Sequence, residues 1–343
     1  MKLSYLKPTL LTLAMCAFSP LAQAQDNTVD FIYHFVLINN GAKSAQQCSE
    51  FANTLEHSPD KATLQQSFSD LVQTWKAVET TYMLGSVAVE TIDYPQLIDV
   101  FHRGNEKLEK ALERALAGDK APEKALYKNS YKSINALEYL LFGVEQPSAR
   151  RQQLLTTITD NLCNKLELIT QAYVDNADKA LSHGKNGKGG QYDKTTAYLL
   201  NSLVESVYKT REWRVGDAAG LSRKYQGNPD PRRQEYYLSG ASLPAIEAIL
   251  KTHERMIGDE FQPNFATYAR ENGAHEALEQ AQQALMQAQN ALTQIQQTPK
   301  EMQFEPKTMR PLFDALDALQ TAYYKHLLKS LDVVAKILDA DGD

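Results

Sequence analysis

The sequence predicts an all-α protein built from antiparallel helical bundles, and two observations carry this prediction. Apolar residues recur at steps of three and four along almost every long segment, which is the period of a helix with one buried face. No segment shows the alternation of apolar and polar residues that is typical of a half-buried strand. About eight such helical segments, joined by short loops, fit two bundles better than one in a chain of 343 residues.

The N-terminal residues 1–24 have the pattern of an export signal. Two lysines precede an apolar run over residues 10–18, and Ala22-Gln23-Ala24 then places small residues where a signal peptidase cuts. We therefore expect cleavage after Ala24 and a mature protein in the periplasm of the cell envelope.

The predicted first half of the mature chain, residues 25–183, contains four helical stripes. They run over residues 64–82, 97–116, 131–143 and 154–173. The third stripe is apolar around most of its girth, which favours a place in the middle of a bundle.

Residues 184–194 follow as a predicted linker or loop, because the glycine-rich run 184–190 cannot hold a helix and has no side chains to bury. The second half is predicted over residues 195–343, with an irregular segment rich in Gly and Pro at 215–240. Its helices are expected from about residue 195 to 208 and over 243–257, 274–297 and 311–338.

The composition and net charge of the chain argue against several classes of protein. Apolar residues make up 43% and charged residues 23% of the chain, which are ordinary values for a folded globular protein. The formal charge of −6 becomes about −8 without the two lysines of the signal, which argues against nucleic acid as a partner. Outside the export segment, no apolar run is long enough to span a membrane.

Three cysteines are present, and signal cleavage removes one of them. Cys48 and Cys163 remain, and in an oxidising compartment they form either one disulfide or two separate buried thiols. A lipoprotein signal ending at Cys16 is disfavoured, since Met15 stands where Gly or Ala is normally needed.

Two groups of polar residues invite a functional interpretation. Glu138 lies inside the apolar segment 134–142, one helical turn after Asn135, and a carboxylate there needs a partner, a hydrogen bond or a metal. The alternative is a satisfied polar pair that fixes the helix register. A basic cluster surrounds the irregular segment, and it either binds an anion or joins the two halves: Lys209, Arg211, Arg214, Arg223, Lys224, Arg232 and Arg233.

Four segments resemble, in the right order, those of the imelysin-like family. Residues 133–143 (SINALEYLLFG) resemble the segment that carries Gly-x-His-x-x-Glu followed by Tyr-Leu-Leu-Phe. Residues 75–82 resemble the tryptophan helix of the family's first half, and residues 211–246 resemble its second-half signature. The ending Asp339-Ala340-Asp341-Gly342-Asp343 is similar to the family's Asp-x-Asp-Gly-Asp terminus.

This resemblance implies a fold of two antiparallel four-helix bundles and a protein of the bacterial cell envelope. The family is known for an insulin-cleaving metallopeptidase and for iron-regulated proteins implicated in iron uptake. Its motif His and Glu are the proposed metal ligands, near the junction of the bundles.

The sequence departs from the family motif at the histidine. Asn135 stands in its place, and Ser133 replaces the motif glycine. Because a carboxamide is a poor ligand for zinc or iron, only Glu138 carries over as a metal ligand. One carboxylate cannot hold a catalytic zinc, which needs three protein ligands and an open position.

The sequence therefore predicts a non-catalytic envelope protein that binds a ligand between its bundles and takes part in iron uptake. The expected ligand is iron or another divalent metal, a ferric chelate, or another small anionic ligand. The residues predicted to line its site are Trp75, Glu79, Tyr82, Ser133, Asn135, Glu138, Arg211, Arg214 and Asp217.

Two alternative functions follow from the same residues. One is a metallopeptidase with a rearranged metal site, completed by ligands that the sequence does not name. The other is an envelope protein-interaction module, docking through the Leu278, Leu285 and Leu292 seam of an Ala- and Gln-rich helix; that seam equally fits bundle core.

Overall fold

The computed structural model confirms the all-α prediction. The structure describes residues 28–57, 60–102, 107–182 and 191–335, and the side chains from residue 194 onward in the last of these ranges. No strand occurs within these residues. The predicted export signal, most of the predicted linker and the aspartate-rich ending lie outside the described part of the chain. Among the helices that are described, none combines the length and apolarity needed to cross a membrane.

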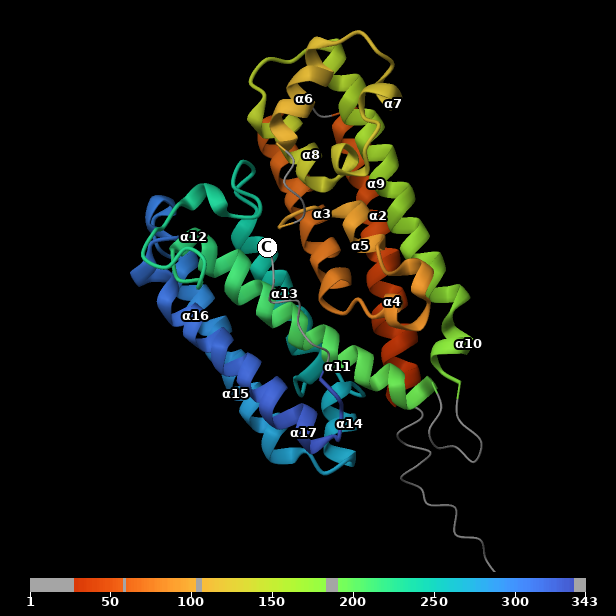
Figure 1. Cartoon of the computed structure of the whole chain (residues 1–343), viewed down its shortest axis with the longest axis vertical. Helices are drawn as coiled ribbons and strands as arrows, with labels where there is room; N and C mark the ends of the chain where they lie inside the picture. The colour runs from red at the N-terminus through yellow and green to blue at the C-terminus, as the bar shows by residue number, and fades with distance from the viewer. Residues whose placement is uncertain (1–27, 58–59, 103–106, 183–190, 336–343) are drawn as a thin grey trace, which may run out of the picture.

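Three long helices frame the first half of the molecule (Figure 1), where α2 packs between α3 and α9. Shorter segments fill the remaining side of this half. The elements are η1 (Tyr33–Ile38), α2 (Asn39–His57), α3 (Lys61–Thr80), α4 (Leu84–Val87), η2 (Val89–Thr91), α5 (Tyr94–Ile98), α6 (Leu108–Ala117), α7 (Pro122–Ala125), η3 (Asn129–Lys132), α8 (Ile134–Glu138), η4 (Tyr139–Gly143), α9 (Ala149–Asp175) and α10 (Ala177–Ala180).

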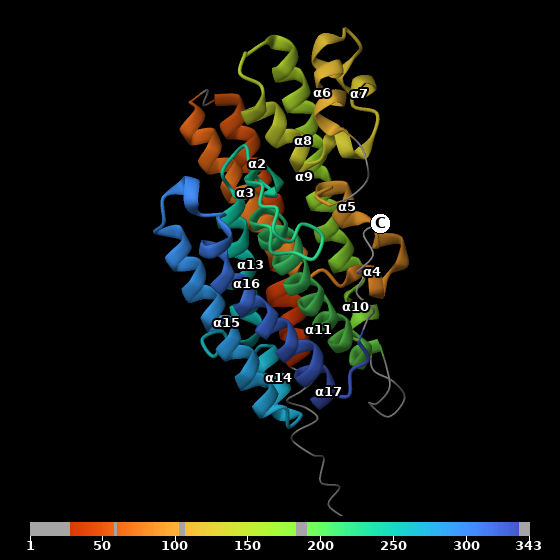
Figure 2. The same ribbon diagram turned by 60° about the vertical axis from the view of Figure 1, so that its left-hand side comes forward.

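Four helices frame the second half, in which α15 packs against α13 and α16, and α16 packs against α11. Both views show these helices running side by side (Figures 1 and 2). The elements are α11 (Gln191–Lys209), η6 (Thr210–Gly216), α12 (Asp217–Ala219), η7 (Pro231–Arg233), α13 (Ser242–Ile257), α14 (Phe265–Glu271), α15 (His275–Gln296), η8 (Lys300–Met302), α16 (Pro306–Thr321), η9 (Ala322–Leu327) and α17 (Leu328–Ser330). This arrangement is consistent with one bundle in each half.

Helix α3 connects the two halves, since it packs against α2 on one side and against α13 and α11 on the other. It begins after Asp60, whose side chain accepts hydrogen bonds from the backbone N–H groups of Ala62 and Thr63 at 3.2 and 2.9 Å. The middle of its apolar stripe is buried, with Phe68 and Trp75 both at 0% exposure.

Two predicted helices differ in the structure. The stripe over residues 97–116 is broken, because α5 ends at Ile98 and α6 begins at Leu108. Asp99 leaves the helix in an extended conformation (φ −132°, ψ 126°), which turns its side chain towards the junction. The last long helix begins at Pro306 rather than Pro311, and its helical continuation ends at Ser330.

The irregular segment after α12 is present as predicted and carries residues of the junction. Gly220 ends α12 with φ 65°, a conformation that favours glycine. A Cβ atom at this position would lie 2.6 Å from the backbone nitrogen of Pro229, so the chain can fold back here only because residue 220 has no side chain.

A disulfide joins Cys48 on α2 to Cys163 on α9, with the two Cα atoms 5.3 Å apart. Of the two possibilities that the sequence left open, the structure has the single crosslink. It closes a loop with a sequence separation of 115 residues. Chain-entropy arguments assign such a crosslink about 4 to 5 kcal/mol of stability.

The leucine seam of α15 is bundle core. Leu278, Leu285 and Leu292 are exposed by 1%, 3% and 3%. These leucines are therefore not available on the surface of α15 for docking a partner protein.

Candidate ligand-binding site at the junction of the two halves

A buried lysine forms the centre of the junction. Lys76 lies on α3 beside Trp75, and its whole side chain is 0% exposed. The helix carries it there because Lys76 falls on the stripe that packs against the second half. A buried ammonium group requires charged or polar partners, and here it has three carboxylates.

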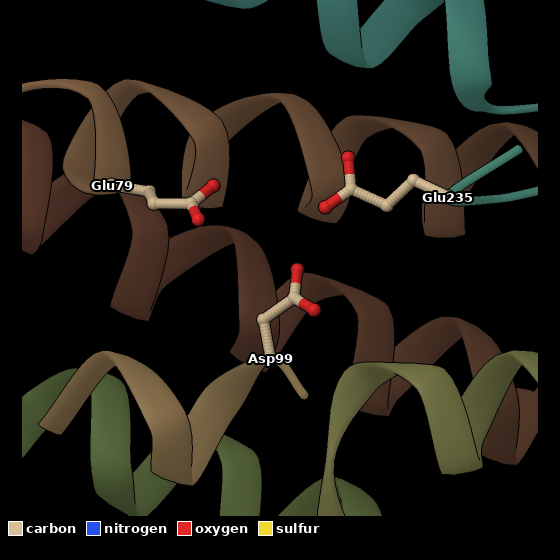
Figure 3. A group of neighbouring side chains, drawn as sticks. All are labelled: Glu79, Asp99 and Glu235. Atoms are coloured by element: carbon tan, nitrogen blue, oxygen red, sulfur yellow. The ribbon is translucent and has the colours of Figure 1, made fainter. Parts of the chain in front are cut away.

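Glu79, Asp99 and Glu235 point their carboxylates towards one another (Figure 3). The Lys76 ammonium lies 2.7 Å from Glu79, 2.9 Å from Asp99 and 2.6 Å from Glu235. Glu79 stands one turn later on α3, Asp99 comes from the break after α5, and Glu235 comes from the irregular segment of the second half. The ammonium group thus joins three chain segments from both halves.

Arg214 adds a second cation to this cluster. It lies on the π-helical segment η6, and its guanidinium is 2.7 Å from Glu235 and 2.8 Å from Glu79. We call Lys76, Glu79, Asp99, Arg214 and Glu235 the ion-pair cluster. Two basic and three acidic side chains therefore meet in a space that is largely closed to solvent, where burial raises the pKa of Glu235.

Two aromatic side chains complete the hydrogen bonds of Asp99. The Trp75 indole N–H donates to Oδ2 at 3.3 Å, and the Tyr236 hydroxyl donates to the same atom at 2.8 Å. The other oxygen of Asp99 accepts from the Phe101 backbone N–H at 2.9 Å. This carboxylate is consequently held in one orientation.

The cluster fixes the ionisation of its members. Burial alone would favour the neutral amine of Lys76 and lower its pKa. The three surrounding carboxylates have the larger effect and raise the pKa of Lys76. Burial likewise opposes the charge on Glu79, yet Arg214 and Lys76 lower its pKa to about 2. Burial also opposes the charge on Asp99. The positive charge of Lys76 and the hydrogen bonds that Asp99 accepts nevertheless hold the pKa of Asp99 below its usual range. These three groups are charged at neutral pH.

The motif segment supports the cluster from the first half. The Ser133 hydroxyl caps α8 by accepting from the Ala136 N–H at 3.2 Å. Asn135 accepts a hydrogen bond from the Val100 backbone N–H at 2.8 Å, directly beside Asp99. The asparagine at the position of the motif histidine therefore fixes the segment that supplies one of the three carboxylates.

Glu138 fixes the other segment. It is 5% exposed and accepts from the Ser239 backbone N–H at 2.9 Å and from the Ser239 hydroxyl at 2.7 Å. Ser239 lies four residues after Glu235, so this contact holds the turn that carries Glu235. Burial raises the pKa of Glu138 to about 7, against the two hydrogen bonds and with help from the negative charges of Glu235 and Asp99.

A polar cavity of about 270 Å³ opens beside the ion-pair cluster. Glu79, Asp99, Arg214 and Glu235 line one part of its wall. Tyr82 and Trp213 add aromatic surface, and α11 contributes Lys209, which pairs with Glu205 at 2.5 Å.

The spacing of the three carboxylates is that of a metal site, but its centre is filled. Their oxygen atoms lie within 4.8 Å of one another, and in the described part of the chain this triad is the group whose spacing could hold an ion. Carboxylate oxygens suit hard ions such as ferric iron. However, the Lys76 ammonium contacts all three carboxylates, and an ion at the same point would meet both Lys76 and Arg214 at close range. The triad in this arrangement accommodates Lys76 and does not fit a metal ion as a second occupant.

Comparison with known protein families shows to which family this chain belongs. A family model described as Imelysin matches residues 39–326. The chain belongs to the imelysin family.

A solved structure shares the imelysin fold. It is the crystal structure of an imelysin-like protein from Psychrobacter arcticus 273-4, with a TM-score of 0.72 and 17% sequence identity. The match covers 92% of this chain and 98% of that one, so the likeness extends over both halves. Among curated proteins, no match was found.

The structure gathers some of the predicted imelysin site residues and separates others. Trp75, Glu79, Tyr82 and Arg214 lie at the cluster or its cavity. Glu138, the predicted metal ligand, contacts Ser239 and is not part of the carboxylate triad.

Arg211 and Asp217 lie outside the cluster. Arg211 pairs with Glu212 at 2.7 Å and also with Asp317. Asp217 pairs with His102 at 2.9 Å, and the His102 ring stacks on Trp213 with 4.7 Å between ring centroids. This second contact also joins the halves of the imelysin fold.

Sequence reasoning missed four residues of the candidate site at the junction: Lys76, Asp99, Glu235 and Tyr236. Lys76 carried a usable signal, because it is a lysine on an otherwise apolar stripe with an acidic residue three positions later. Asp99 and Glu235 carried none, since both lie outside regular helices.

The first prediction concerns Lys76→Met. Removing the ammonium leaves three buried carboxylates with Arg214 alone, so we expect unfolding to become easier by about 3 to 5 kcal/mol. Added zinc or ferric ion should then raise the melting temperature of the variant and leave that of the wild type unchanged. The matched control is Lys251→Met, whose exposed pair with Glu247 should cost less than about 1 kcal/mol. A wild-type protein that is stabilised by metal as strongly as the variant would contradict our description of the triad.

The second prediction concerns the pH dependence of Glu138→Gln. In the wild type, the Glu138 carboxyl has a pKa of about 7 in the folded protein, against 4.5 for an ordinary glutamate in water. Its raised pKa therefore contributes stability that is complete below pH 4.5 and is lost as the pH rises to about 7, by about 3 kcal/mol. The glutamine stays neutral at every pH. The free energy of unfolding of the variant should therefore rise relative to that of the wild type by about 3 kcal/mol between pH 4.5 and about pH 7. Denaturant unfolding at several pH values, with the disulfide intact, measures the difference; a difference independent of pH would show that Glu138 is not buried.

Proposed function

We propose that this imelysin-family protein is an exported, non-catalytic binding protein that takes part in iron uptake. Its ligand binds in the cavity beside the ion-pair cluster, between the two halves of the molecule. The proposal concerns a chelated or otherwise complexed ligand rather than a bare ion.

The observation that carries the non-catalytic part is the position of Lys76. A catalytic metal needs three protein ligands and an open coordination position. Here the three carboxylates surround an ammonium group at 2.6 to 2.9 Å. The motif residues Asn135 and Glu138 are likewise engaged in hydrogen bonds to Val100 and Ser239, which position the cluster.

The cavity supports a small polar ligand of mixed charge. Its wall presents carboxylates from Glu79 and Glu205 together with the cationic groups of Lys209 and Arg214. The cations suit the oxyanion groups of a chelator, and the acidic groups suit its cationic centre. A volume of about 270 Å³ is near the lower end for small-molecule sites.

Export and a role in iron uptake rest on the N-terminal pattern and on the family resemblance. The export pattern over residues 1–24 supports a periplasmic location for the mature chain. Some proteins of the imelysin-like family are iron-regulated, and a binding protein without an enzymatic site is compatible with that role.

The third prediction tests the cavity. Titration of the mature protein with ferric citrate in a calorimeter should give saturable heat, and iron-free citrate should bind about tenfold more weakly or less. Ser86→Trp should reduce ferric citrate binding by about tenfold or more, because Ser86 is an exposed residue of the cavity wall and an indole there fills the opening. The matched control, Ser49→Trp, changes an exposed residue of α2 outside this wall and should bind as the wild type does. Equal effects of the two variants, or no heat in the wild type, would refute binding at this site.

The fourth prediction tests catalysis. The mature protein with zinc supplied should not cleave an unfolded reporter peptide above the rate of a protein-free control. Cleavage that a chelator abolishes and that Glu138→Gln also abolishes would establish the metallopeptidase alternative instead. The same preparation should retain its calorimetric response to ferric citrate, which excludes an unfolded sample as the cause of inactivity.

A further inference from the structure

A groove at the end of the first half is lined mainly by basic side chains, whereas the chain as a whole is acidic. It lies between α6 and the chain around η3 and has a volume of about 700 Å³. Helix α6 is at the end of the first half, away from the region where α3 meets α13 (Figures 1 and 2). Four basic residues and one acidic residue line the groove, although the protein carries a net charge of −6. The groove is separate from the cavity at the junction, and the two share no lining residue.

Three cations form one wall of this groove. Lys110 and Arg114 lie one turn apart on α6, and Lys107 is the residue that directly precedes this helix; all three line the groove. All three are exposed. Their positions extend over about 10 Å along the helix axis. The Arg114 Nε donates to the Lys110 carbonyl at 3.2 Å, which holds the guanidinium against the helix.

Tyrosine rings form the opposite wall. Tyr127 and Tyr131 meet edge to face, with ring centroids 5.4 Å apart and planes at 83°. The Lys128 ammonium lies over both rings, 6.0 and 5.7 Å from their centroids. Tyr131 is buried, whereas Tyr127 is 69% exposed and presents a large apolar surface beside the cations.

The acidic residue of the groove does not cancel the basic wall. Glu113 accepts a hydrogen bond from the Tyr139 hydroxyl at 3.1 Å, which draws its carboxylate towards η4. Small side chains, Ala111 and Ala117, line the space between the two walls. The groove therefore offers separated cations on one side and an exposed aromatic ring on the other.

From this arrangement we infer that the groove binds a small ligand that carries two or more oxyanion groups on a ring-shaped body. The oxyanions, carboxylate or phosphate, contact Lys107, Lys110 and Arg114, and the ring packs against Tyr127. A long polyanion fits less well, because only one ring is exposed for stacking and the negative charge of the rest of the protein repels a chain that extends beyond the groove. This inference is independent of the function proposed for the junction.

Calorimetry of the mature protein at low salt tests the inference with three small probes. Benzene-1,3,5-tricarboxylate and inositol trisphosphate are ring-shaped and distinguish carboxylate from phosphate. Propane-1,2,3-tricarboxylate has the same number of carboxylates as the benzene derivative without a ring, so these two probes form the charge-matched pair. We expect at least one ring-shaped probe to bind more tightly than the open-chain probe, with an affinity that falls as salt is added.

Two variants assign the binding to this groove. The triple variant Lys107→Gln, Lys110→Gln, Arg114→Gln should weaken binding about tenfold, at roughly two- to threefold for each exposed cation. Its matched control is Lys300→Gln, Lys307→Gln, Arg310→Gln, which removes the same three charges from exposed positions elsewhere and should bind as the wild type does. Tyr127→Ala should weaken binding of the ring-shaped probes and leave that of propane-1,2,3-tricarboxylate unchanged.

Several results would overturn the inference. They are equal losses in the two triple variants, no binding of any probe, or tighter binding of a ten-nucleotide single-stranded DNA than of the small anions. Since the altered side chains are exposed, circular dichroism and melting temperature should match the wild type and exclude unfolding. Ser86→Trp should leave anion binding unchanged, so failure at the junction cavity and failure at this groove remain distinguishable.

Discussion

The structure depends on one ammonium group that is removed from water and held by three carboxylates. Lys76 has no exposed surface, and each of its acidic partners comes from a different part of the chain. Burying such a charge is costly unless every partner is in place, so the cluster forms only when both halves are folded and docked. The pairing of the halves is therefore specified by charge, in addition to the apolar contact of α3 with α13.

The two motif residues acquire a physical role from this constraint. Asn135 holds the backbone next to Asp99, and Glu138 holds the turn that follows Glu235. Each fixes one of the carboxylates that must meet Lys76. An amide serves this purpose as well as an imidazole does, because accepting one backbone N–H needs only an oxygen or nitrogen atom at the correct place. The motif in this chain thus positions two carboxylates of the cluster.

Periodicity in the sequence predicts most of the long helices but not the site, and it gives no helix over Asn39–His57, where the structure has α2. The stripes around Trp75 and Leu285 were located correctly because helical spacing and burial are local properties of the sequence. Asp99 was placed inside a helix, since the apolar stripe continues on both sides of it and nothing nearby reveals that a distant lysine draws it out. Glu235 lies in an irregular segment, where side-chain direction has no period. The disulfide remained open for the same reason, because separation along the chain says nothing about distance in space.

The contact between Lys76 and Glu235 also limits how the molecule can move. Lys76 belongs to a long helix of the first half and Glu235 to the second half, 2.6 Å apart. A hinge motion that parted the halves would break this pair and leave its two charges without their partners. The contact therefore favours a fixed arrangement of the two halves on either side of the cavity.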